Sequence, residues 1–163
     1  MNPPASRSRQ GLGLVGWLLA VFATAALGAA ASVDAPSFYA RLVKPTWAPP
    51  SGVFGPVWTT LYVAMAVAVW LVWRSSRRTP LGLGLFAAQL VANALWSWLF
   101  FRWHLGAWAT LEVLVLAALI VATTAAFWRT SRLAALLLVP YLAWVAFASA
   151  LTYSVWQANP FLL

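Results

Sequence analysis

The chain has 163 residues, of which 64% are hydrophobic and only 7% are charged, whereas a soluble globular domain usually carries about 25% charged residues. This composition excludes a water-soluble surface. The net charge is +8, and because basic residues beside apolar segments usually report membrane orientation, we expect no binding of nucleic acid. With no cysteine, one histidine and only two acidic residues, Asp34 and Glu112, the chain cannot form a metal site made of cysteines or several histidines, and we expect no catalytic triad or carboxylate pair.

Five segments are long and apolar enough to cross a bilayer, whose hydrocarbon core of about 30 Å requires about 20 helical residues. They are residues 11–31, 53–73, 81–101, 107–128 and 133–156. The first is longer than the apolar part of a signal peptide and has no strong cleavage site before Asp34, so we expect it to be retained as a helix. The sequence therefore predicts an all-α fold, a single domain over residues 1–163 that forms an integral membrane bundle of five transmembrane helices. The short connections predict that consecutive helices are antiparallel neighbours.

The basic residues alternate in number between the two ends of the predicted bundle. Seven of the ten Lys and Arg residues lie in the N-terminal segment and in the second and fourth connections, and three lie in the first and third connections. Cytoplasmic loops are enriched in Lys and Arg. We therefore expect the N-terminus in the cytoplasm and the C-terminus outside.

The first connection contains a stiff segment at residues 44–50. A cation, three prolines and a tryptophan combine there, and proline both fixes φ and prevents helix continuation. One interpretation is a rigid cap over one mouth of the bundle. The other is a loop that its tryptophan anchors at the membrane interface. The candidate cap residues are Lys44, Pro45, Trp47, Pro49 and Pro50.

The third predicted helix carries a mixed polar and aromatic stripe. Gln89, Asn93, Trp96 and Phe100 have the spacing of one helical face. Amides are costly in hydrocarbon unless they are paired, so this face is expected to point into the bundle. Hydrogen bonds between helices and a ligand site both explain the stripe, and both stay open here.

Aromatic residues converge on the same interior from other helices. Trp58 and Tyr62 form a pair on the second helix, Trp108 precedes the intramembrane acid Glu112 on the fourth, and the fifth carries one stripe of Tyr141, Trp144, Ala148 and Leu151. A cavity with such walls suits a flat, apolar, aromatic ligand, because ring stacking contributes about 0.5–1.5 kcal/mol per pair beyond area burial. Glu112 has either a functional role inside the bundle or an interfacial one.

Small residues lie on another face of the third helix. Gly84 and Ala88, four residues apart, permit close approach of two helix backbones in a membrane, and Leu95 continues this face. We therefore expect a homodimer through the third helix.

Four motifs in order resemble one membrane protein family. They are KPTWAPP at residues 44–50, GPVWTTLY at 55–62, QLVAN at 89–93 with Trp96 and two following phenylalanines, and PYLAW at 140–144 with Ala148 and Leu151. They are similar to the translocator protein (TspO/MBR) family, which includes the mitochondrial peripheral benzodiazepine receptor and bacterial tryptophan-rich sensory proteins. The similarity covers roughly residues 38–156.

The resemblance implies a commonly dimeric five-helix membrane fold whose pocket binds porphyrins and benzodiazepine-site ligands, without an obligatory cofactor or metal. It also implies a bacterial inner membrane as the location. Transferred by motif, the ligand-binding residues are Trp58, Tyr62, Gln89, Asn93, Trp96, Phe100, Trp108, Trp144, Ala148 and Leu151. The family's proposed cholesterol motif requires a basic residue after Tyr153, and Gln157 stands there instead, so the sequence does not support cholesterol binding.

The sequence favours a porphyrin-binding sensor or carrier and leaves two other functions open. One is an enzyme that degrades porphyrin with light and oxygen, for which Trp144 is the candidate catalytic residue because tryptophan is readily oxidised. The other is a scaffold for partner membrane proteins.

Overall fold

The computed structural model describes residues 7–163, all of them in helices, turns and connections. Six α-helices follow one another in the order α1 (Arg7–Ala31), α2 (Ala35–Arg41), α3 (Phe54–Trp73), α4 (Pro80–Ser97), α5 (Gly106–Trp128) and α6 (Arg132–Ala158). A short 3-10 helix, η1 (Ser51–Val53), precedes α3, and a π-helical turn, η2 (Trp98–Arg102), extends α4. Five helical segments of the described chain are long and apolar enough to cross a membrane. The expected all-α membrane fold is thus confirmed.

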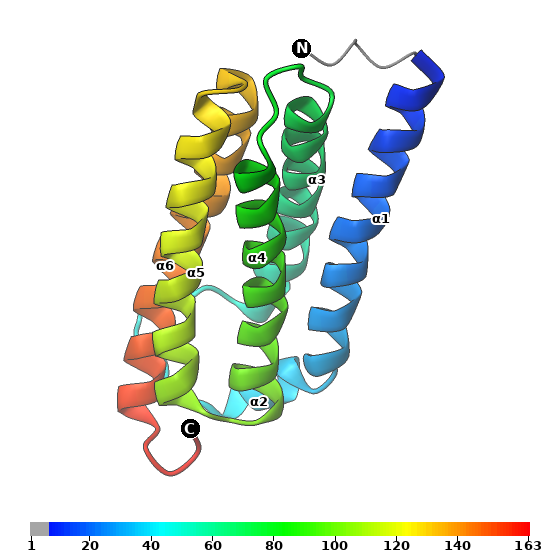
Figure 1. Ribbon diagram of the computed structural model, residues 1–163. Coiled ribbons are helices and arrows are strands. Elements are labelled where there is room, and N and C mark those ends of the chain that lie inside the picture. Colours follow the sequence, from blue (N-terminus) through cyan, green and yellow to red (C-terminus); the bar gives the residue numbers. More distant parts are fainter. Residues whose placement is uncertain (1–6) are drawn as a thin grey trace.

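The five long helices form a closed ring. Extensive contacts join α1 to α3, α3 to α6, α6 to α5, α5 to α4, and α4 back to α1. Figure 1 shows these helices running roughly side by side, with α2 lying across the end of the bundle where the chain terminates. The expectation that every short connection joins packed neighbours is wrong for α3 and α4, which touch little because α1 lies against both of them.

Local sequence explains where the helices begin. Thr79 precedes α4 and its hydroxyl accepts a hydrogen bond from the Gly82 amide at 3.2 Å, with Pro80 in the first turn. Ser131 caps α6 in the same way, accepting from the Ala134 amide at 3.3 Å. Such caps satisfy amides that have no partner inside the helix, and proline suits the first turn because its missing N–H is not needed there.

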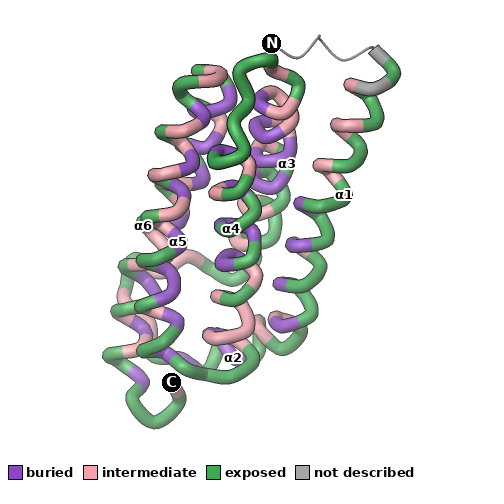
Figure 2. The backbone as a smooth tube through the Cα atoms, in the orientation of Figure 1, coloured by how far each residue is buried: buried purple, intermediate pink, exposed green. Residues whose placement is uncertain are grey.

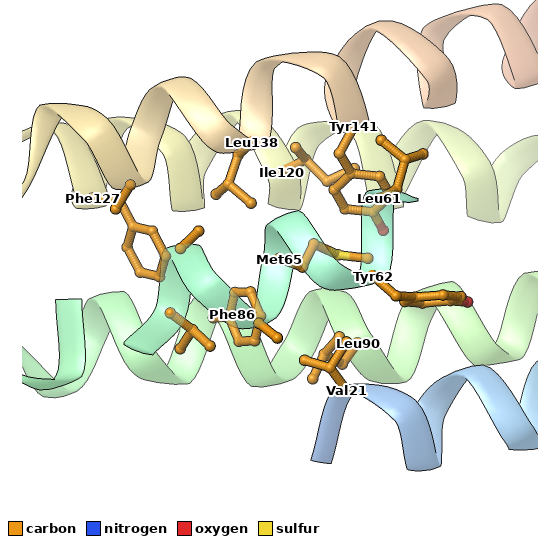
Figure 3. Packing of buried hydrophobic residues seen from close by; sticks show 14 of the residues in the cluster. Val21, Leu61, Tyr62, Met65, Phe86, Leu90, Ile120, Phe127, Leu138 and Tyr141 are labelled. Carbon is orange, nitrogen blue, oxygen red and sulfur yellow. The ribbon is translucent and has the colours of Figure 1, made fainter. Parts of the chain in front are cut away.

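The described side chains pack inward as two clusters. The larger fills the bundle and includes Met65, Phe86, Ile120 and Tyr141 (Figure 3). Figure 2 marks the buried positions along the helices. The smaller lies at the α2 end of the bundle. Large apolar side chains such as Leu19, Val91 and Leu136 remain exposed on the outside, which is the surface that lipid covers in a membrane protein.

Candidate functional site

A cavity of about 600 Å³ lies between α1, α2, α3 and α4, toward the α2 end of the bundle. Among residues 7–163, no charged side chain lines it. Seven of its lining residues are aromatic, namely Phe22, Tyr39, Phe54, Trp58, Tyr62, Trp96 and Phe101. The cavity is therefore a mostly apolar chamber with aromatic walls.

Small residues of α1 form the wall opposite the aromatic rings. Ala25, Ala26, Gly28 and Ala29 all line the cavity. A Cβ atom on Gly28 would lie 3.2 Å from the Ser97 hydroxyl oxygen, so glycine permits α1 to approach α4 closely at this point. These four small side chains leave space for the cavity beside α1.

Packing fixes the aromatic rings of the opposite wall. Trp58 stacks on Tyr62, with ring centroids 5.5 Å apart and planes 29° apart, and also meets Tyr141 edge-on at 6.2 Å. Trp96 stacks on Phe100 at 5.5 Å with an interplanar angle of 9°. Rings held on both sides present a preformed surface to a ligand, so binding does not require them to be ordered first.

Asn93 joins three helices behind this wall. The Tyr62 hydroxyl donates to Asn93 Oδ1 at 2.7 Å, and Asn93 Nδ2 donates to the Tyr141 hydroxyl oxygen at 3.1 Å. Figure 3 shows both tyrosines in the buried cluster. Of the two interpretations that the sequence left open, hydrogen bonding between helices holds for Asn93, which lies outside the cavity lining.

Other buried polar groups have no hydrogen-bond partner within the described part of the chain. These are both polar atoms of the Gln89 amide, both carboxyl oxygens of Glu112, the Trp96 indole nitrogen and the Thr124 hydroxyl. Gln89 is fully buried, and Glu112 is 9% exposed. Glu112 therefore faces the inside of the bundle, six residues after the start of α5.

The structure brings only part of the expected site together. Trp58, Tyr62 and Trp96 line the cavity. The other expected residues do not line it: Gln89, Asn93, Phe100 and Leu151 are buried, Trp144 and Ala148 are half-buried, and Trp108 is 62% exposed.

Trp108 departs from the expectation because of its angular position on α5. The buried face of this helix contains Ala109, Val113, Leu116 and Ile120. At about 100° per residue, Trp108 lies about a quarter of a turn from the centre of that face. Trp144 is closer to the cavity, since its ring packs edge-on against the lining residue Phe54 at 5.9 Å.

The loop at residues 44–50 supports the cavity from outside, and none of the five candidate cap residues lines it. The Lys44 amine donates to the carbonyl oxygens of Tyr39 and Leu42 at 2.7 and 2.8 Å and lies 4.9 Å from the Tyr39 ring. The Tyr39 hydroxyl donates to the Pro49 carbonyl at 3.0 Å. Burial also raises the pKa of Tyr39 above its ordinary value.

Trp47 anchors the same loop to the bundle. Its ring meets Phe147 of α6 edge-on at 5.7 Å and remains 48% exposed. The loop is thus tied to α6 at one point and to the cavity wall at Tyr39.

Sequence reasoning missed Asn159, Tyr39 and the α1 wall. Asn159 is buried at the end of α6 and holds Val43 through its side-chain amide. The available signals were weak: an asparagine before Pro160, and a run of alanine and glycine in an otherwise plain apolar segment.

Comparison with known proteins gives a consistent family. The model of the TspO/MBR family matches residues 17–157. The chain is 44% identical to the Translocator protein of Homo sapiens over 126 residues, covering 75% of each chain. It is 41% identical to the Tryptophan-rich protein TspO of Chlorobaculum tepidum over 143 residues (83% of this chain and 90% of that one) and 37% identical to Protein CrtK of Rhodobacter capsulatus over 149 residues (88% and 93%). The chain belongs to the TspO/MBR family of integral membrane proteins.

Proposed function

We propose that the chain binds a flat, largely apolar aromatic ligand of the porphyrin type in the cavity between α1, α2, α3 and α4, and acts as a sensor or carrier of that ligand. The observation that carries this proposal is the preformed aromatic wall of Trp58, Tyr62 and Trp96 around a cavity of about 600 Å³. Benzodiazepine-site ligands belong to the same chemical class of flat aromatic molecules.

The size and polarity of the cavity support this ligand class. Small-molecule pockets typically measure about 300–1,000 Å³ and combine apolar walls with a few polar groups. Here the polar side chains of the lining are uncharged: they are hydroxyls, including those of Ser32, Ser51, Thr59 and Ser97, and the indole N–H groups of its tryptophans. A ligand with an extended ring system would bury much apolar area, whereas a small ion would find no charged partner among these residues.

The position of the cavity mouth also fits a ligand that dissolves in lipid. Ala26 and Ala29 of α1 and Gly55 and Thr59 of α3 line the cavity and are themselves exposed. These four residues lie on membrane-spanning segments, so the opening between α1 and α3 faces the bilayer. A hydrophobic ligand would enter from the membrane.

The experiment that tests binding is a titration of the purified chain with protoporphyrin IX in the dark, read by quenching of tryptophan fluorescence. We expect saturable quenching, and a loss of affinity of about tenfold in Trp58→Ala and in Trp96→Ala, because one stacked ring contributes up to about 1.5 kcal/mol. Trp108→Ala is the matched control, since Trp108 lies exposed on α5 away from the cavity. Equal losses in Trp108→Ala and Trp58→Ala would contradict this location of the site.

A second candidate function is degradation of the bound porphyrin by light and oxygen. The observation that favours it is the presence of two tryptophans, Trp58 and Trp96, in the cavity wall, because tryptophan is the most easily oxidised side chain that this cysteine-free chain offers. A scaffold for partner membrane proteins is the third candidate, and capture of partner proteins that does not change with ligand would separate it from the sensor.

A further inference from the structure

A second hollow lies at the seam between α1 and α3, toward the N-terminal end of α1. Its volume is about 290 Å³, and it is lined by Gly13, Gly16, Trp17 and Ala20 of α1 and Trp73 of α3. None of these residues lines the aromatic cavity. Gly16 and Ala20 are exposed and both helices span the membrane, so the hollow opens on the lipid-facing surface.

Specific contacts hold the two helices together beside this hollow. A Cβ atom on Gly13 would overlap the Trp73 ring, so that ring lies directly against the α1 backbone. The Trp70 indole nitrogen donates to the Gln10 carbonyl at 2.9 Å. At Gly16, by contrast, a Cβ atom would meet nothing within 4 Å. The hollow is thus a defined apolar groove with aromatic walls, open on the Gly16 side.

Arginines lie at the end of this groove. The exposed Arg74 follows Trp73, and its guanidinium group lies over the Trp70 ring at 4.8 Å. Arg78 reaches back and donates to the Trp73 carbonyl at 3.0 Å. Both cations therefore lie where α3 leaves the membrane, next to the aromatic wall of the groove.

The chain offers no carboxylate to balance these cations. Its only acidic residues are Asp34 and Glu112. Asp34 precedes α2 at the opposite end of the bundle, and Glu112 is buried within α5 (Figure 1). Counter-charge at the α1–α3 seam must therefore come from outside the chain.

We propose that the groove is a binding site for an anionic phospholipid, with one acyl chain in the hollow and the headgroup phosphate against Arg74. An apolar groove between two membrane-spanning helices suits an acyl chain, and basic pockets between transmembrane helices bind anionic headgroups. A guanidinium group forms paired, charge-assisted hydrogen bonds with phosphate oxygens. The site goes beyond the proposed porphyrin function and does not depend on it.

The test measures which phospholipids stay bound to the full-length chain after purification from vesicles that mix phosphatidylglycerol with phosphatidylcholine, by native mass spectrometry. Gly16→Leu fills the groove, and Gly11→Leu is its matched control because Gly11 is also exposed and a Cβ atom there also meets nothing within 4 Å. Arg74→Gln removes the cation, and Arg129→Gln, an exposed arginine after α5, is its control.

We expect Gly16→Leu to lose bound lipid of both kinds, and Arg74→Gln to keep lipid but lose about fivefold of the preference for phosphatidylglycerol. The two control variants should match the unmodified chain. The proposal is overturned if Gly16→Leu retains its lipid, or if Arg129→Gln loses as much preference as Arg74→Gln, which would indicate diffuse attraction by the whole basic end. If Gly16→Leu does not fold, the comparison of the two arginine variants decides alone.

Discussion

Asn159, at the end of α6, holds Val43 in the loop beyond α2 by a reciprocal pair of hydrogen bonds. The Val43 amide donates to Asn159 Oδ1 at 2.9 Å, and Asn159 Nδ2 donates to the Val43 carbonyl at 2.9 Å and to the Val155 carbonyl at 2.7 Å. The same loop binds the cavity residue Tyr39 through Pro49. One side chain therefore ties the last helix to the segment that supports the cavity.

Asn159→Leu should release this loop while leaving the helical bundle intact. The backbone groups of Val43 would lose their partners, and a lost hydrogen bond of this kind costs about 0.5–1.5 kcal/mol. We expect faster hydrogen exchange at residues 42–50 and weaker protoporphyrin binding. Gln157→Leu, at an exposed neighbouring position, is the control. Unchanged exchange at Val43 in the Asn159 variant would show that the pair does not restrain the loop.

The link between Asn93, Tyr62 and Tyr141 gives a second prediction. Asn93→Leu leaves two buried tyrosine hydroxyls without this partner, so we expect a loss of stability of about 1–3 kcal/mol, measured by thermal unfolding in detergent. Tyr62→Phe in the same background should then cost little more, because the interaction is already broken. Strictly additive losses would contradict a shared network.

The sequence was sufficient for the five spanning helices but not for their arrangement. Long apolar segments identify the membrane-spanning helices because the bilayer thickness sets their length. Gln89 and Asn93 face inward, as expected from the free-energy cost of exposing an amide to hydrocarbon. The order of the helices around the bundle cannot be read from the sequence in the same way. A short connection limits the distance between two helix ends but does not determine which helices pack against each other. The placement of α1 against both α3 and α4 therefore came only from the structure.

The cavity itself was predictable only in part, for a physical reason. Trp58, Tyr62 and Trp96 were found because large aromatics on an inward face are conspicuous. The α1 wall consists, apart from Phe22, of alanine and glycine, which leave no clear amphipathic signal in a largely apolar segment. The seven-residue α2 was missed because it is too short for periodicity to identify it.

The expected dimer can be tested on the outer face of α4. Gly84, Ala88 and Leu95 are all exposed, and a Cβ atom on Gly84 meets nothing within 4 Å of this chain. Ala88→Phe should weaken dimers by preventing close backbone approach, without affecting ligand binding. Ala118→Phe, on an exposed position of α5, is the control. Equal masses for the two variants by light scattering in detergent would exclude this face as the interface.

Membrane orientation follows from the distribution of arginines. Arg74, Arg77 and Arg78 lie at the bundle end away from α2, with Arg129 and Arg132, and the α2 end holds Arg41, Lys44 and Arg102 (Figure 1). We expect the end richer in arginine to face the cytoplasm. Single cysteines at Ser6, which lies outside the described residues, and at Leu163 can be labelled cleanly in this cysteine-free chain. If Ser6→Cys is labelled from outside intact cells and Leu163→Cys is not, the expected orientation is wrong.

The last prediction concerns light-dependent chemistry on a bound porphyrin. With one histidine, two acidic residues and no cysteine in the chain, we expect reactivity to come from the ligand, light and oxygen, while the protein supplies orientation and exclusion of water. Trp144 was the expected electron donor, yet it does not line the cavity and packs against the lining residue Phe54, whereas Trp58 and Trp96 line the cavity directly.

Phenylalanine keeps an aromatic plane for stacking but is much harder to oxidise than tryptophan. We therefore expect Trp58→Phe or Trp96→Phe to slow the loss of the porphyrin Soret band under illumination more than Trp144→Phe does, with dark affinity nearly unchanged in all three. A larger effect of Trp144→Phe would identify Trp144 as the electron donor. Equal bleaching rates in every variant and in detergent without protein would exclude the enzymatic function and leave a binding protein.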